Sequence, residues 1–174
     1  MLKRSGPVAL VVAGALLLLG SAGYLLYARA LANPGAAAVP EAIAGMPLSQ
    51  KTVGVEAVAE VTRLHGKEFP LTSGAMAMYG QGAATLWVSG TAANPLAAGM
   101  VRAMTDKIAD ASAGSARSPF TPLGERQMSG RTVYELSGMG QRHFYFQSSN
   151  LVIWLAVDET IAENALDETL QFYP

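Results

Sequence analysis

The amino-acid sequence predicts an α+β protein: one N-terminal transmembrane helix and one small domain of antiparallel sheet with helices on one face. Three observations predict this class. Residues 5–28 form an apolar run without a charged side chain. Short β-type segments follow, separated by glycine-containing turns. The segments between them carry apolar residues at helical spacing.

The composition excludes several function classes. The chain has no cysteine, so disulfides, thiol catalysis and zinc–thiolate sites are excluded. It has 12 basic and 13 acidic side chains, and Lys3, Arg4 and Arg29 flank the apolar run, which leaves the remainder mildly acidic. A mildly acidic domain without a basic patch is a poor binder of nucleic acid. Two histidines without ligand spacing predict no metal site, and no phosphate-binding motif or cofactor is expected.

The apolar run has the length of a membrane span. At about 1.5 Å per residue, residues 5–28 extend over roughly 36 Å, which exceeds a hydrocarbon core of about 30 Å. Tyrosines favour the headgroup layer, and two of them end the run. The expected anchor residues are Pro7 in the first turn, Leu16, Leu17 and Leu18 in the middle, and Tyr24 and Tyr27 at the far end.

The flanking charges orient the span. Lys3 and Arg4 outweigh Arg29, so the positive-inside rule places residues 1–4 in the cytoplasm and the domain on the extracytoplasmic side of a bacterial-type inner membrane. The alternative is a signal peptide cleaved after Ala32, since Ala30 and Ala32 have the small-x-small spacing of a cleavage site. A signal peptide usually has an apolar core of only about 7–15 residues. Both readings place the domain on the same side.

Residues 29–48, rich in proline, glycine and alanine, are expected to form a semi-extended tether, and residues 49–174 the folded domain. We expect helices over residues 49–65, from Asn94-Pro95 onward, and over 159–171, the last with a capping box of Thr160 and Glu163. Strands are expected over 75–79, 85–89, 131–137, 142–147 and 151–157, and a loop over 111–124.

The two halves of the domain resemble one another. YGQGAATLWVSG aligns with FQSSNLVIWLAV at a constant offset, which matches Tyr79 with Phe146 and Trp87 with Trp154. Each hairpin is followed by a helix, so the pattern indicates a duplicated β-hairpin–helix unit.

One sheet face is the candidate partner-binding surface. A loop over 138–140 would pair Ser137 with Gln141, and therefore Glu135 with His143. In that register the core face holds Tyr134, Leu136, Phe144, Phe146, Ile153 and Leu155. The opposite face presents Val133, Glu135, His143, Tyr145, Val152 and Trp154. Tyrosine and tryptophan are favoured interface anchors. The alternative is that a loop or helix covers this face.

These patterns predict a non-enzymatic, membrane-anchored interaction module, an accessory subunit or docking protein that binds other membrane or envelope proteins. A second hypothesis is a small-molecule or lipid-binding domain, with the ligand among Met76, Met78, Met100 and Met104. A third is a hydrolase in which Glu135 orients His143 as a base, although the chain has no G-x-S-x-G nucleophile motif.

Overall fold

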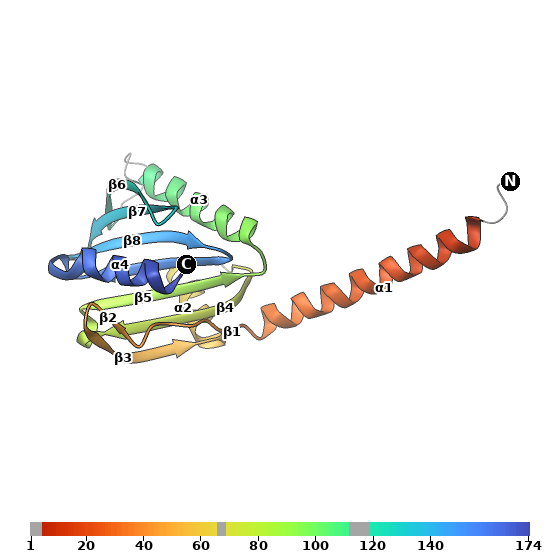
Figure 1. Ribbon diagram of the computed structural model, residues 1–174, viewed down its shortest axis with the longest axis horizontal. Helices are drawn as coiled ribbons and strands as arrows, with labels where there is room; N and C mark the ends of the chain where they lie inside the picture. The colour runs from red at the N-terminus through yellow and green to blue at the C-terminus, as the bar shows by residue number, and fades with distance from the viewer. Residues whose placement is uncertain (1–4, 66–68, 112–118) are drawn as a thin grey trace.

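The computed structural model describes residues 5–65, 69–111 and 119–174 and has the predicted α+β class (Figure 1). A long helix, α1 (Ser5–Ala32), projects from one end of the domain. Its segment Gly6–Ala32 is long and apolar enough to cross a membrane, by length and composition. The expected cytoplasmic residues 1–4 lie outside the described part of the chain.

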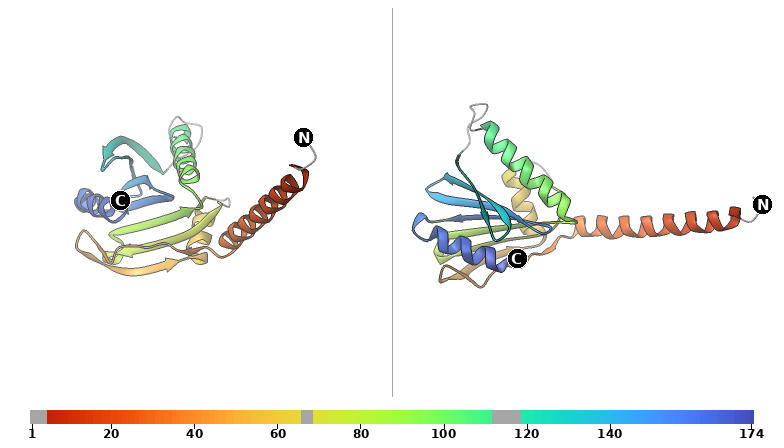
Figure 2. Two further views of the ribbon diagram at one scale, coloured as in Figure 1. Left: turned by 45° about the vertical axis from the view of Figure 1, so that its right-hand side comes forward. Right: turned by 45° about the horizontal axis from the view of Figure 1, so that its top comes forward.

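The domain is built on one curled sheet with the strand order β2-β3-β4-β5-β9-β8-β7-β6, antiparallel throughout this path (Figure 2). A two-residue strand, β1, adds to β4 in parallel. The strands are β1 (Gly35–Ala36), β2 (Ala42–Ile43), β3 (Met46–Val53), β4 (Leu71–Tyr79), β5 (Ala84–Thr91), β6 (Phe120–Met128), β7 (Arg131–Gly138), β8 (Gln141–Ser148) and β9 (Leu151–Val157).

Helices cover both faces of this sheet, so the expectation of helices on one face is wrong (Figure 2). The α4 face is covered by α4 (Ala162–Phe172), and the α3 face by α3 (Asn94–Asp110). The helix α2 (Val55–His65) shares the α3 face, because a Cβ on Gly74 would lie 2.9 Å from Val58 Cγ2. The central strands are apolar on both sides, and each side therefore needs a cover. The buried strand residues of the α4 face are Ala75, Ala77, Tyr79, Ala84, Leu86, Val88, Val133, Phe144, Phe146, Ile153, Leu155 and Val157.

The expected tether is part of the folded domain, so the expected linker over residues 29–48 is wrong. Residues 35–48 form β1, β2 and the start of β3, and they run along the α4 face as a strap. Ile43 is fully buried there, and Ala37 is also buried. Two tyrosine hydroxyls hold the strap in place: Tyr79 donates a hydrogen bond to the Pro40 carbonyl at 2.9 Å, and Tyr173 donates one to the Ala38 carbonyl at 2.7 Å. The composition of residues 29–48 resembles that of a linker. Tyr79 and Tyr173, which hold this segment, lie much later in the sequence, so the local composition could not predict their contacts.

Most expected elements are present, and apart from β1 and β2 in the expected linker the errors concern β3 and β6. The expected strands 75–79 and 85–89 lie inside β4 and β5, joined by the short 3-10 turn η1 (Gly80–Gly82). The expected helix over 49–65 begins only at Val55, since residues 49–53 belong to β3. β6 occupies part of the expected loop 111–124 and extends beyond it. The last helix begins with the 3-10 turn η3 (Glu159–Ile161).

The two similar halves lie side by side at the centre of the sheet. The hairpin β4–β5 abuts the hairpin β8–β9, and Trp87 is the direct cross-strand partner of Trp154. The following helices do not repeat, because α3 and α4 pack on opposite faces. The resemblance between the halves therefore extends to the hairpins and stops at the helices.

Candidate functional site: an aromatic row across the α3 face

A row of large side chains crosses five strands of the α3 face. Its members are successive cross-strand partners: Met76, Trp87, Trp154, Tyr145 and Tyr134. Side chains that are directly opposite in neighbouring strands project from the same face and contact one another. The Tyr134 and Tyr145 rings stack with centroids 4.8 Å apart, and the Tyr145 and Trp154 rings stack at 5.3 Å. The row is therefore a continuous apolar and aromatic ridge.

The helix α3 covers one end of this row. Tyr145 is only 1% exposed, and its hydroxyl lies 3.0 Å from Thr105 Oγ1 of α3. Ala97 and Val101 of α3 are buried in the same cluster. Phe120 of β6 contacts Trp154 edge-on with ring centroids 5.3 Å apart. The expectation of an open aromatic face is thus wrong over β7 and β8, and the covered alternative applies there.

His143 is buried beneath this cover, with both ring nitrogens engaged. Its Nε2 lies 3.0 Å from the Gly138 carbonyl, which can only accept, and the Trp154 indole N–H donates to His143 Nδ1 at 3.2 Å. These partners fix the neutral tautomer with the proton on Nε2. Burial lowers the pKa of His143, against a smaller opposing effect of the Gly138 hydrogen bond. The ring serves to position Trp154 and has no free nitrogen for proton transfer.

Glu135 lies on the opposite face from His143, so the expected Glu–His pair is wrong. The strands pair Gly138 with Gln141, which places Glu135 opposite Phe144. The turn has two residues, Met139 and Gly140, both with positive φ (51° and 81°), instead of the expected three. Two-residue turns of this kind match the twist of paired strands. The one-residue slip moves Val133 and Glu135 to the α4 face, away from the other expected partner-binding residues.

Glu135 belongs instead to a charged cluster at the edge of the α4 face. It pairs with Arg142 and, at 3.3 Å, with Arg126. Arg142 also binds Glu159 at 2.5 Å, and Arg126 binds Glu163 at 3.0 Å. Glu163 therefore pairs with the sheet instead of closing the expected capping box. This cluster ties η3 and α4 to β6, β7 and β8, and only the correct strand register would have revealed it.

The other end of the row is open between α2 and α3. Met76, Trp87 and Trp154 are partly exposed, and we call them the aromatic strip. The Trp87 indole nitrogen is buried, and no described residue accepts a hydrogen bond from it. A buried indole N–H usually has a partner. The exposed parts of these three side chains present an apolar surface, whereas the Trp87 N–H itself is out of reach of an external group.

The four candidate ligand-binding methionines fall into two groups. Met100 and Met104 of α3 pack against the buried cluster around Tyr145, whereas Met76 and Met78 lie on β4 at the open end. A groove of about 640 Å³ lies elsewhere, between the end of α1 and α2. It is lined mainly by apolar side chains, among them Leu31, Val58, Phe69 and Leu71.

In the described part of the chain, no three histidine or carboxylate side chains lie close enough together to form a metal site.

Comparison with other proteins gives no further information on the function. No protein-family model, no curated protein and no solved structure matches the chain.

Proposed function

We propose that the protein is a single-span, membrane-anchored interaction module with its domain on the extracytoplasmic side. The support is α1, whose central leucines Leu16, Leu17 and Leu18 are 64–74% exposed. A helix that is apolar all round and whose central residues contact no described part of the domain is suited to a lipid environment. By the positive-inside rule, Lys3 and Arg4 favour an N-terminus in the cytoplasm. The helix continues without interruption to Ala32, past the length of a signal-peptide core.

The proposed partner is another membrane or envelope protein, bound at the aromatic strip. The observation that carries this proposal is Trp87, a partly exposed ring with a buried indole N–H that no described residue accepts. Tryptophan in such a position is a typical interface anchor. The partner supplies an apolar side chain that covers the exposed part of the ring. The role is that of an accessory subunit or docking protein, without catalysis of its own.

The test is co-purification of the full chain in mild detergent, comparing Trp87→Ala with Phe172→Ala. Phe172 is 41% exposed on α4 and serves as the matched control, because its substitution removes an exposed aromatic ring far from the strip. We expect Trp87→Ala to reduce the recovered partner about tenfold or more, as loss of an interface anchor does. Phe172→Ala should leave recovery unchanged. Equal recovery from Trp87→Ala and the unsubstituted chain, with circular dichroism showing both folded, would remove the strip from consideration.

A second candidate function is lipid or small-molecule binding, and the groove between α1 and α2 favours it. Its apolar lining and its position beside the anchor suit an acyl chain. A native mass spectrum of gently purified protein would show a retained lipid mass under this alternative. Recovery of the bare chain alone would leave the protein-docking role as the sole candidate.

A further inference from the structure

The anchor is joined to the domain without a flexible segment. Only Asn33 and Pro34 separate α1 from β1. The Asn33 N–H still bonds to the Arg29 carbonyl at 2.9 Å, and Pro34 is buried. Gly54 lies directly against this junction with φ +66°, and a Cβ there would be 3.0 Å from the Pro34 carbonyl oxygen. The junction is therefore packed, and the domain is held at a fixed distance from the end of α1.

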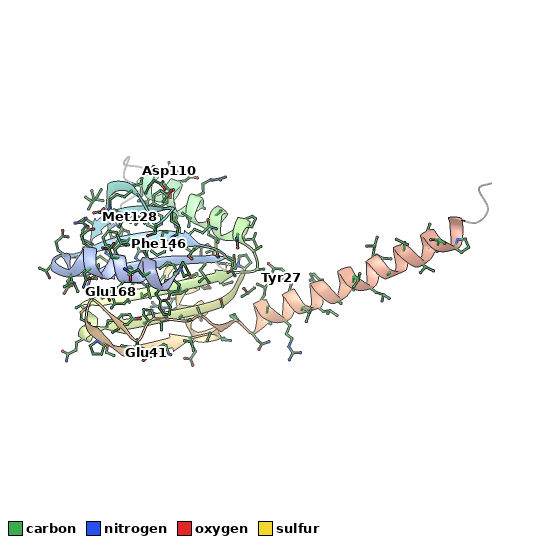
Figure 3. All side chains as sticks on the ribbon, viewed as in Figure 1. Tyr27, Glu41, Asp110, Met128, Phe146 and Glu168 are labelled. Carbon is green, nitrogen blue, oxygen red and sulfur yellow. The ribbon has the colours of Figure 1, made fainter. Side chains whose placement is uncertain are left out.

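That distance is short. Tyr27 lies near the domain end of α1, at the position where an aromatic ring marks the headgroup layer (Figure 3). From Tyr27 to Asn33 the helix rises roughly 9 Å at about 1.5 Å per residue. If α1 spans the bilayer as proposed, the nearest end of the domain begins within the headgroup layer.

The strand directions show which residues form that proximal end. β1 pairs with the start of β4, whose Leu71 is opposite Thr91 at the end of β5. Gly90 in turn is opposite Leu151, where β8 turns into β9. Two connections at this end, residues 91–96 and 148–151, contain no charged residue, whereas the α2–β4 connection includes Lys67 and Glu68 in its sequence and Arg131 follows the β6–β7 turn. The opposite, distal end carries Asp158, Glu159, Glu163 and Arg142.

Apolar side chains are exposed at the proximal end. Val53 at the end of β3 is 36% exposed, Val55 at the start of α2 is 55% exposed, and Leu96 at the start of α3 is 42% exposed. The groove of about 640 Å³ between α1 and α2 lies at the same end, because Pro34, Val55 and Leu71 line it. We call these three side chains and the groove the proximal rim. Arg63, which pairs with Glu60, is one of the residues that line the groove, and Glu56 lies beside the rim on α2.

We infer that the proximal rim rests in the headgroup layer of the bilayer that α1 spans, with lipid occupying the groove between α1 and α2. The inference rests on the proposed membrane span. Its occupant is a phospholipid, because the groove continues the apolar surface of α1 and the exposed side chains of the rim, Val53, Val55 and Leu96, are apolar. A seated domain would have one orientation, with the acidic distal end directed away from the membrane and the aromatic strip on its flank.

The absence of cysteine makes this inference directly testable, because a single introduced cysteine is the only labelling site. The full chain is reconstituted in nanodiscs of phosphatidylcholine and phosphatidylglycerol that contain a nickel-chelating lipid. A spin label is placed in turn at Val55→Cys, Leu96→Cys, Met139→Cys and Leu17→Cys. Met139 is the distal control, since it is 70% exposed at the β7–β8 turn, and Leu17 reports the span itself.

We expect the labels at positions 55 and 96 to relax at least threefold faster than the label at 139, because headgroup-bound nickel lies close to them. The label at 17 should be protected from a water-soluble nickel chelate. Equal relaxation at 55, 96 and 139 with a protected position 17 would overturn the seated domain and leave the span intact. Exposure of position 17 to the soluble chelate would overturn both.

Discussion

The two faces of the sheet differ in how completely they are covered. On the α4 face, the strap of residues 35–48 and α4 close over the sheet, and side chains such as Leu86, Phe144, Ile153 and Leu155 are fully buried. On the α3 face, α3 packs over β8 and β9, but Met76, Trp87 and Trp154 are partly exposed. From this difference we expect the α4 face to contribute more to the stability of the domain, and the proposed partner to bind on the α3 face.

The closure of the α4 face depends on contacts that are distant in sequence. The hydroxyls of Tyr79 and Tyr173 bind the strap, and burial raises the pKa of both phenols. They therefore remain protonated donors across the physiological range of pH. Arg131 fixes the chain end on the same face by bonding to the Leu170 carbonyl at 2.9 Å and to the Tyr173 carbonyl.

The largest expected contrast between the faces is in stability. Leu155→Ala should lower the free energy of unfolding by about 2–5 kcal/mol, because it leaves a cavity in a fully packed core. Trp87→Ala should cost only about 1 kcal/mol, since the ring is partly exposed. The measurement is denaturant unfolding of both variants of the full chain in the same detergent. Equal losses would contradict the assignment of stability to the α4 face.

A smaller effect is expected at the charged edge of the α4 face. Arg142→Leu should cost about 3 kcal/mol, because it removes the main partner of the buried Glu135 carboxylate. Arg126→Leu should cost about 1 kcal/mol, because Arg126 is more exposed and Arg142 still pairs with Glu135. Thermal or denaturant unfolding of the two variants gives the comparison. A larger loss from Arg126→Leu would show that Arg142 is not the principal partner.

The smallest expected effect is a pH dependence from the α3 face. Burial holds the pKa of His143 below its ordinary value, so the unfolded state binds a proton more readily than the folded state. The contribution of the neutral His143 ring to the free energy of unfolding is complete above about pH 6.5, the pKa of histidine in the unfolded state. It is lost as the pH falls through the lower pKa of the folded state, with a slope of at most about 1.4 kcal/mol per pH unit. Unfolding curves of the full chain and of His143→Gln between pH 7.5 and 5 should converge on acidification. A constant difference between them would show that His143 does not titrate with unfolding.

Local patterns were sufficient to predict the central elements. Alternation around glycine-containing turns predicted β4, β5, β8 and β9, and the Asn94-Pro95 start predicted α3. β6 was missed because Pro122 and Gly124 interrupt its pattern, and the structure has a register shift between them. The β-branched segment before Gly54 was assigned to a helix because its apolar residues also fit helical spacing.

The candidate site was predicted only in part. Tyr145, Val152, His143 and Trp154 do share one face, because β8 and β9 alternate regularly. Glu135 and Val133 were misplaced because the sequence Gly138-Met139-Gly140 alone does not decide between a turn of two residues and one of three. A change of one residue in the turn moves every side chain of the strand to the opposite face of the sheet. The cover by α3 and the strap could not be predicted, because both depend on where distant segments dock.

The central claim is that the domain is carried outside the cytoplasm on an uncut anchor. A membrane-impermeant maleimide applied to intact cells that produce Met139→Cys tests it directly, because this side chain is exposed at the distal end. We predict rapid labelling without detergent, on a protein whose intact mass includes the α1 segment. Labelling only after the cells are permeabilised, or a labelled chain that begins at Asn33, would contradict the account.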